Sequence, residues 1–75
     1  MKTKLTPREA EILMDVLDGL SDEEIKSKRF IEITTIKSHL AMLYYKFGVN
    51  TRSKLIAKIY KDKINKIKTA LISVV

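Results

Sequence analysis

The sequence predicts an all-α domain of four helices, the last of which is extended. Apolar residues recur at spacings of three and four along most of the 75 residues, which is the period of amphipathic helices. Two segments open with the Ser/Thr-x-x-Glu pattern of a capping box, and glycines follow two of the periodic segments. We therefore expect one domain over residues 1–75, with its core in 5–60 and a C-terminal extension in 61–75.

The first helix is expected over residues 7–18. Thr6 can cap it, Pro7 suits its first position, Glu9 completes the capping box, and Gly19 ends it. Its apolar stripe, which has Ile12 beside it, consists of Leu13, Val16, Leu17 and Leu20. The acids placed off that stripe are Glu11, Asp15 and Asp18.

The second helix is expected over residues 22–29, with another capping box at 21–24. Its apolar content is limited to Ile25, followed by Phe30 just past its end, and its second half is basic. A turn as short as residues 30–32 makes the helices on either side cross at a large angle. The pattern therefore predicts a helix-turn-helix arrangement.

The third helix is expected over residues 33–47 and ends at Gly48. Glu32 is a poor N-cap because Ser, Thr, Asp or Asn is preferred there, although Thr34 could cap a helix that starts slightly later. One stripe of this helix is bulky and apolar, namely Ile36, Leu40, Leu43 and Phe47.

The opposite stripe of the third helix is small and polar, and Lys37 and Met42 flank it. Its members are Thr34, Ser38, Ala41 and Tyr45. A face of small residues lets a helix approach another surface closely, such as the floor of a DNA major groove. An ordinary amphipathic helix with short outer side chains gives the same pattern, so this stretch alone leaves both interpretations open.

The fourth helix begins at Arg52, and Asn50 or Thr51 can cap it. A heptad seam runs along it, consisting of Ala57, Tyr60, Ile64, Ile67, Leu71 and Val74. We expect residues 56–60 to fold onto the domain itself and residues 64–74 to pair with a second chain. The predicted dimer interface consists of Tyr60, Ile64, Ile67 and Leu71. A rival interpretation is that the β-prone tail, ALISVV, is not helical.

The net charge of +6 is unevenly distributed along the chain. Residues 1–25 carry 3 cations and 7 acids, whereas residues 26–75 carry 12 cations and 2 acids. A basic balance confined to one part of a small domain favours a polyanionic partner such as nucleic acid, although a lysine-rich surface is also common in soluble proteins.

Composition argues against several classes of protein. No cysteine is present, which excludes disulfides, a thiolate nucleophile and a Cys-type zinc site, and a lone His39 cannot build a metal site. No nucleophile–base pair or Gly-rich phosphate loop occurs, so we expect no enzyme, no cofactor and no small-molecule ligand in this domain. No apolar run approaches a membrane span and no signal peptide opens the chain, which predicts a cytoplasmic protein without membrane contact.

Several motifs resemble those of one known family. Residues 5–13, LTPREAEIL, resemble the LTxREx(E/D)(V/I)L opening of the LuxR-type helix-turn-helix domain. Residues 19–25 look like its G(L/K)(S/T)NKEIA segment, and residues 35–40, TIKSHL, are similar to its TVKxHL signature. Residues 46–49, KFGV, together with Arg52 match the K(L/F)GVxxR motif at the end of the family pattern. In order and at this spacing, the motifs together are highly specific over residues 5–60.

The resemblance implies a DNA-binding output module of the kind found in quorum-sensing regulators and response regulators, in the winged-helix-like superfamily. Its third helix would lie in the major groove, and its fourth helix would form the dimer contact. The implied base-edge readers are Lys37, Ser38 and Ala41, to which the helical wheel adds Thr34 and Tyr45. The expected phosphate contacts, or polar supports around them, are Thr35, Lys46, Arg52, Lys26 and Lys28.

Individual side chains leave alternatives open. Lys37 is the best candidate for a guanine contact through the O6 and N7 acceptors, but a phosphate contact suits a lysine nearly as well. Tyr44 and Tyr45 could donate to phosphates, and Tyr44 is expected to be half in the core. His39 matches the family histidine and is interpreted as a packing and hydrogen-bonding residue.

Three positions depart from the family pattern. Lys26 replaces a small Ala, Arg29 replaces an apolar Leu, and Glu32 replaces the Ser cap of the third helix. We expect weaker packing of the second helix, even if the two long stems lie along the interface. Glu32 also brings a negative charge near the expected position of a phosphate.

The favoured function is a sequence-specific transcriptional regulator that binds double-stranded DNA as a homodimer on an inverted repeat. One alternative is a diverged protein–protein adaptor or co-regulator with little DNA specificity. Another alternative is a module like sigma-factor region 4. The KFGV motif and the long fourth helix argue against that alternative.

Overall fold

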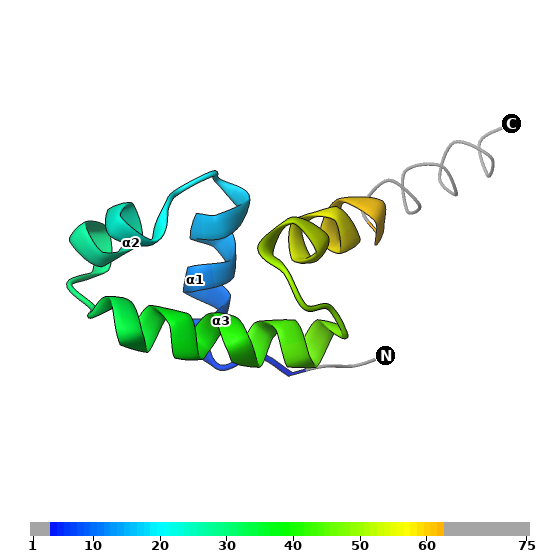
Figure 1. The fold of residues 1–75 in the computed structure, drawn as a ribbon, viewed down its shortest axis with the longest axis horizontal. Helices are drawn as coiled ribbons and strands as arrows, with labels where there is room; N and C mark the ends of the chain where they lie inside the picture. Colours follow the sequence, from blue (N-terminus) through cyan, green and yellow to red (C-terminus); the bar gives the residue numbers. More distant parts are fainter. Residues whose placement is uncertain (1–3, 63–75) are drawn as a thin grey trace, which may run out of the picture.

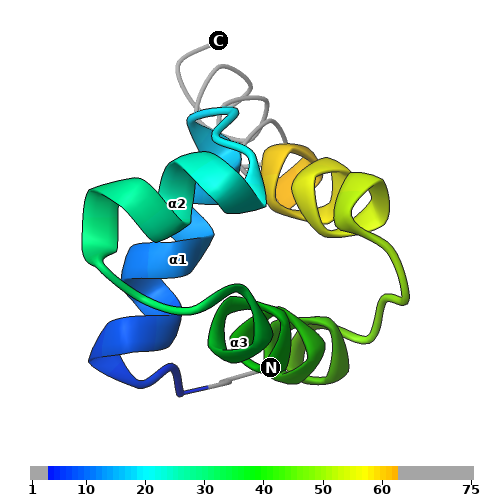
Figure 2. The same ribbon diagram turned by 60° about the vertical axis from the view of Figure 1, so that its left-hand side comes forward.

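A computed structural model describes residues 4–62, which form an all-α fold without strands (Figure 1). The helices are α1 (Pro7–Leu17), α2 (Asp22–Arg29) and α3 (Ile33–Phe47), and a fourth helical segment occupies residues 52–62. Figure 2 shows α1, α2 and the fourth segment arranged around one space, with α3 closing its remaining side. The predicted bounds of the first three helices are confirmed to within one residue.

Local hydrogen bonds explain where the helices begin and end. At α1, the Glu9 backbone N–H donates to Thr6 Oγ1 at 3.1 Å, and Glu9 Oε1 accepts from the Thr6 N–H at 3.0 Å. Ser21 and Glu24 make the same reciprocal pair at α2, so both capping boxes are confirmed. Glu32 occupies the N-cap of α3 but makes no side-chain cap hydrogen bond, as predicted.

One core cluster joins the helices. Its buried members are Ile12, Leu13, Val16, Ile25, Ile36, Leu40, Leu43 and Leu55. The apolar stripe predicted for α3 is confirmed, with Phe47 half-buried at its end. On α1 the buried stripe is rotated toward Ile12, and Leu17 and Leu20 are only half-buried. The buried surface of α1 is wider than one stripe because α1 packs against α3 and also holds two buried carboxylates, Glu9 and Asp15, which accept ion pairs from α3 and α2.

Phe30, at the end of α2, does not join the core. Phe30 takes a left-handed backbone conformation with φ 56° and ψ 46°, and its N–H donates to the Lys26 carbonyl at 2.8 Å. This conformation turns the chain toward α3 and leaves the Phe30 side chain 94% exposed. Ile25 is therefore the one residue of α2 that is fully buried.

A buried carboxylate attaches α2 to α1. Asp15 is 1% exposed, which contradicts its expected place off the buried surface of α1. Arg29 Nε lies 2.6 Å from Asp15 Oδ2, Arg29 Nη2 lies 3.0 Å from Oδ1, and Lys28 Nζ lies 2.8 Å from the same Oδ1. The hydrogen bonds from Arg29 hold the pKa of Asp15 below its ordinary value, against the opposing effect of burial. Arg29 thus replaces an apolar contact with a bidentate ion pair.

Two further ion pairs fix the remaining elements. Lys46 Nζ near the end of α3 lies 2.6 Å from Glu9 Oε1, and Glu9 is buried at the start of α1. The hydrogen bond from Lys46 makes the largest contribution to lowering the pKa of Glu9, and the hydrogen bond from the Thr6 N–H makes the second largest. Arg52 Nη1 lies 2.6 Å from Asp22 Oδ1, and Nη2 donates to the Leu20 carbonyl at 2.7 Å. These bonds connect the fourth segment to the first residue of α2 and to the loop that precedes it.

The fourth segment is capped by Thr51, whose Oγ1 accepts from the Lys54 N–H at 3.1 Å. Leu55 is fully buried, and Ile56 and Ile59 pack against the core, so that part of the segment folds onto its own domain as predicted. Tyr60 instead remains 46% exposed, because it lies on a different face from Leu55 and Ile59. The other predicted interface residues, Ile64, Ile67 and Leu71, lie outside the described residues.

The ion pair of Asp15 and Arg29 leads to a test by substitution. Asp15→Ala should lower the free energy of unfolding by about 3 kcal/mol, because it leaves a partly buried guanidinium with only the half-exposed carboxylate of Glu11 as its anion. The double substitution Asp15→Leu with Arg29→Leu should restore the stability of the unsubstituted chain or exceed it. Urea denaturation measures both, with Glu23→Ala as an exposed control. A double variant as unstable as Asp15→Ala would contradict the assignment.

The same carboxylates predict how stability depends on pH. The folded-state pKa values of Asp15 and Glu9 are lowered, so the unfolded chain binds more protons in acid. Their stabilising contribution should be complete above about pH 4.5 and lost progressively as the pH falls through the lowered values. Denaturation between about pH 5 and pH 3 should show a shallower loss for Asp15→Asn than for the unsubstituted chain. Equal slopes would mean that Asp15 is not a source of the acid sensitivity.

Candidate nucleic-acid interface

The outer face of α3 gathers all the residues that the sequence placed there. Each of the predicted base readers is exposed, namely Thr34, Lys37, Ser38, Ala41 and Tyr45. The stripe on the opposite side of the helix is buried, so this face points away from the core. The structure therefore brings the predicted base-reading residues together on one accessible helical surface.

The chemistry of this face combines donors with small apolar groups. Lys37 has no ion-pair partner among the described residues, so its ammonium is available to an acceptor outside the domain. The Ser38 hydroxyl donates to the Thr34 carbonyl at 3.1 Å, which leaves its lone pairs facing outward. Tyr45 is 82% exposed and presents both a ring and a hydroxyl. Such a face offers hydrogen-bond donors and acceptors at close approach.

The residues predicted to contact phosphates divide into two groups. Thr35 and Lys26 are exposed, and Lys26 has no ion-pair partner among the described residues. Lys46 is engaged by Glu9 and by the Lys4 carbonyl, and Arg52 by Asp22 and the Leu20 carbonyl. Lys46 and Arg52 are thus bound to acceptors within the domain, and their role as supports around a phosphate stays a prediction. Direct phosphate contacts by these residues stay predictions.

Lys28 is intermediate between these groups. Its ammonium lies 2.8 Å from Asp15 Oδ1, yet its side chain remains 48% exposed. A half-exposed ammonium can share a carboxylate and still face an outer anion, because a lysine has three donors. Its predicted role as a phosphate contact is likewise untested by the geometry.

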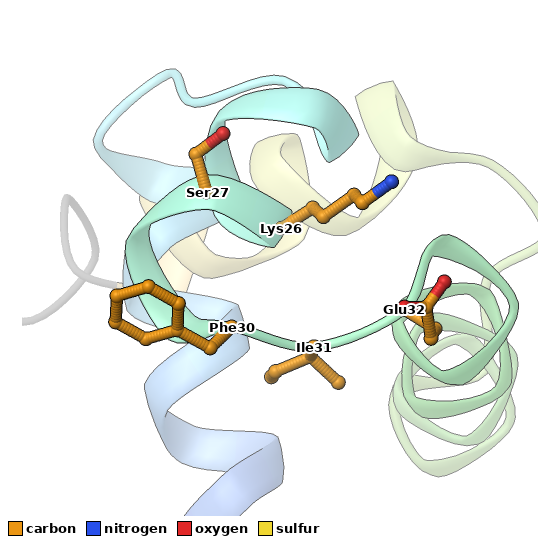
Figure 3. Close-up of a pocket in the computed structure, with 5 residues that line it drawn as sticks. All are labelled: Lys26, Ser27, Phe30, Ile31 and Glu32. Atoms are coloured by element: carbon orange, nitrogen blue, oxygen red, sulfur yellow. The ribbon is translucent and has the colours of Figure 1, made fainter.

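Beside the amino end of α3 lies a shallow hollow (Figure 3). It is lined by Lys26, Ser27, Phe30, Ile31 and Glu32. Figure 3 shows the Lys26 ammonium and the Glu32 carboxylate projecting toward the same open side between α2 and α3, while Phe30 points the other way. Sequence reasoning identified Lys26 and Glu32 separately but not that they share one hollow.

Sequence reasoning also missed the carboxylates that support the interface. Glu9 was assigned only to a capping box and Asp15 was placed off the apolar stripe of the first helix, whereas both are buried acceptors for cations. One signal was present, since Asp15 directly precedes Val16 and follows Ile12 by three positions, which places it beside the buried surface of α1. Tyr44 packs half-buried against the core, as expected, and His39 is also half-buried.

Two kinds of feature are absent from the part of the chain that the structure covers. Residues 4–62 contain no group of three His, Cys, Asp or Glu side chains that could hold a metal ion. Within the same residues, no helix combines the length and the apolar character needed to cross a bilayer.

Comparisons with known proteins agree with the geometry. Residues 3–59 match the family of bacterial regulatory proteins of the luxR type. The chain is 35% identical over 52 residues to an HTH-type transcriptional regulator of Mycobacterium bovis, covering 69% of this chain and 6% of that protein. It is 33% identical over 60 residues to the response regulator VraR of Staphylococcus aureus, covering 80% of this chain and 29% of VraR.

A solved structure shows the same fold. The response regulator ChrA of a heme-sensing two-component system superposes with a TM-score of 0.74 at 35% sequence identity, covering 84% of this chain and 31% of ChrA. The chain thus spans less than a third of each of these relatives. The family match covers most of the chain, and it includes the helix-turn-helix and the exposed face of α3. This chain therefore belongs to the LuxR family of bacterial regulatory proteins and carries that family's helix-turn-helix domain.

Proposed function

We propose that this chain binds double-stranded DNA sequence-specifically and regulates transcription, with α3 lying in the major groove. The observation that carries the proposal is the exposed, small and polar face of α3, with Lys37 free of any ion pair in the described chain. The family match and the regulators among the relatives support the same role. A role on the bacterial chromosome also implies a cytoplasmic location.

Phosphate contacts would supply much of the affinity. The exposed lysines without an ion-pair partner in the described residues are Lys4, Lys26, Lys37, Lys54, Lys58 and Lys61. Binding that neutralises several phosphates releases counterions, so the affinity should fall steeply as salt is raised. Base contacts from Thr34, Lys37, Ser38, Ala41 and Tyr45 would then add the preference for one sequence.

A homodimer fits the exposed part of the fourth segment. Tyr60 is 46% exposed and is continuous in sequence with the heptad positions Ile64, Ile67 and Leu71. A chain of this size also has a limited core of its own, which favours a partner. Two-fold symmetry would place two copies of α3 on an inverted repeat with half-sites about one helical turn apart.

A second candidate function is that of a protein co-regulator. Phe30 is 94% exposed and lies next to Ile31 on the surface of the turn, which offers an apolar contact for another protein. Salt separates the two functions, because an apolar contact does not weaken by orders of magnitude as salt rises.

Selection from a random-sequence duplex library at near-physiological salt tests the DNA-binding function and its dimeric form together. Enrichment of an inverted repeat is the expected result, and its half-site spacing gives the dimer geometry. Lys37→Ala should then lose roughly 1–3 kcal/mol of binding free energy on the enriched site and much less on unrelated duplexes. Lys58→Ala, which removes an equally exposed cation from the fourth segment, is the matched control. An equal loss on all duplexes would make Lys37 a phosphate contact.

The dimer interface is tested by the paired substitution Ile64→Asp with Ile67→Asp. Placing carboxylates on the seam should convert a dimer into a monomer, because two desolvated charges oppose association. Analytical ultracentrifugation of both proteins at matched concentrations measures the change. Lys63→Asp, which lies off the seam, controls for the added negative charge. Identical sedimentation of the paired variant and the unsubstituted chain would reject the seam.

A further inference from the structure

The carboxylate of Glu32 has no intramolecular partner among the described residues. Glu32 stands at the N-cap of α3, yet its side chain makes no cap hydrogen bond. It is exposed and has no ion-pair partner within the described residues. By contrast, Glu9, Asp15 and Asp22 each accept an ion pair, and Glu24 completes a capping box. A negative charge at this N-terminus suits the dipole of α3, but no hydrogen bond or ion pair within the described residues holds the carboxylate there.

Lys26 shares the hollow with Glu32 and is likewise without an ion-pair partner in the described chain. The ammonium and the carboxylate project toward the same open side between α2 and α3 (Figure 3). Both side chains are exposed, so each can reorient toward the other or toward an outside charge. The hollow therefore presents a cation and an anion together beside the amino end of the proposed recognition helix.

We propose that Glu32 limits the affinity of this chain for DNA by competing with a backbone phosphate for the ammonium of Lys26. The inference rests on the proposed function, in which α3 enters the major groove and the phosphates of the groove edge approach its amino end. A phosphate that meets Lys26 also meets the carboxylate of Glu32, and the two anions repel each other. Since every sequence carries the same phosphates, the competition weakens binding to all duplexes alike.

This competition changes how the binding free energy is divided between phosphate and base contacts. Lower affinity for phosphates leaves a larger share of the binding free energy to base contacts by the exposed face of α3. It also makes binding depend more on a second copy that contributes another set of contacts. Glu32 thus lowers the affinity for every duplex and leaves the ratio of affinities between two sites to the base contacts.

The decisive variant is Glu32→Gln, which removes the charge and keeps the shape. We expect it to bind the enriched duplex and an unrelated duplex about three- to tenfold more tightly, by the same factor, at low salt. The gain should shrink as salt is raised, because the opposing charges are exposed. Asp18→Asn is the matched control, since it removes an exposed acid at the C-terminal end of α1 and should leave affinity unchanged.

A double-variant cycle tests the role of Lys26. Lys26→Gln alone should weaken binding, and adding Glu32→Gln to it should yield a clearly smaller gain than in the unsubstituted background. An undiminished gain would overturn the competition for Lys26. Weaker binding of Glu32→Gln to the enriched duplex alone would also overturn the proposal, because it would make Glu32 an acceptor for a base amino group.

Fluorescence anisotropy with the full chain separates failure of this inference from failure of the proposed function. Retained DNA binding that weakens with Lys37→Ala but does not change with Glu32→Gln would overturn this inference alone. Absence of binding to any duplex, by the unsubstituted chain and the variants alike, would overturn the proposed function and this inference with it. Circular dichroism verifies that Glu32→Gln is folded, as expected for a side chain with no intramolecular bond in the described structure.

Discussion

The helix-turn-helix of this chain depends on the ion pair between the Asp15 carboxylate and the Arg29 guanidinium. α2 has only 8 residues and offers the core one fully buried side chain, Ile25, so apolar burial alone gives it a single point of attachment. The bidentate contact provides a second point on α1, and two points fix the orientation of a short helix. Because the carboxylate is almost completely removed from water, each cation that reaches it is held firmly. The position of α2 in turn sets the direction from which the chain enters α3.

α3 performs two tasks on opposite faces. Ile36, Leu40 and Leu43 close the core, while the small polar side chains on the other face remain exposed. Lys46 ties the end of this helix to the buried Glu9 of α1, which limits its rotation about its own axis. A recognition helix benefits from such rigidity, because base contacts require donors and acceptors at fixed positions. The contacts that hold α3 in place thus lie outside its exposed face.

The positive charge of the domain also has two uses. Arg29, Lys46 and Arg52 satisfy buried or half-buried acceptors, whereas Lys26 and Lys37 face solvent around the amino-terminal half of α3. Net charge consequently overstates the number of cations that a polyanion would meet. Lys26 also shares its hollow with the carboxylate of Glu32. The exposed cations beside the amino-terminal half of α3 are therefore fewer than the net charge suggests.

The sequence by itself determined the helix bounds and the two faces of α3, because caps, glycine stops and apolar periodicity act within a few residues of one another. Both capping boxes and the unsatisfied cap at Glu32 were predictable for this reason. Only the tertiary structure decided that Asp15 and Glu9 are buried and bound by Arg29 and Lys46. The ion pair between Arg52 and Asp22 was likewise decided by the tertiary structure. Those bonds join residues 14, 30 and 37 positions apart, and whether they form depends on how the helices cross. Helical periodicity describes one helix at a time and contains no information about that crossing.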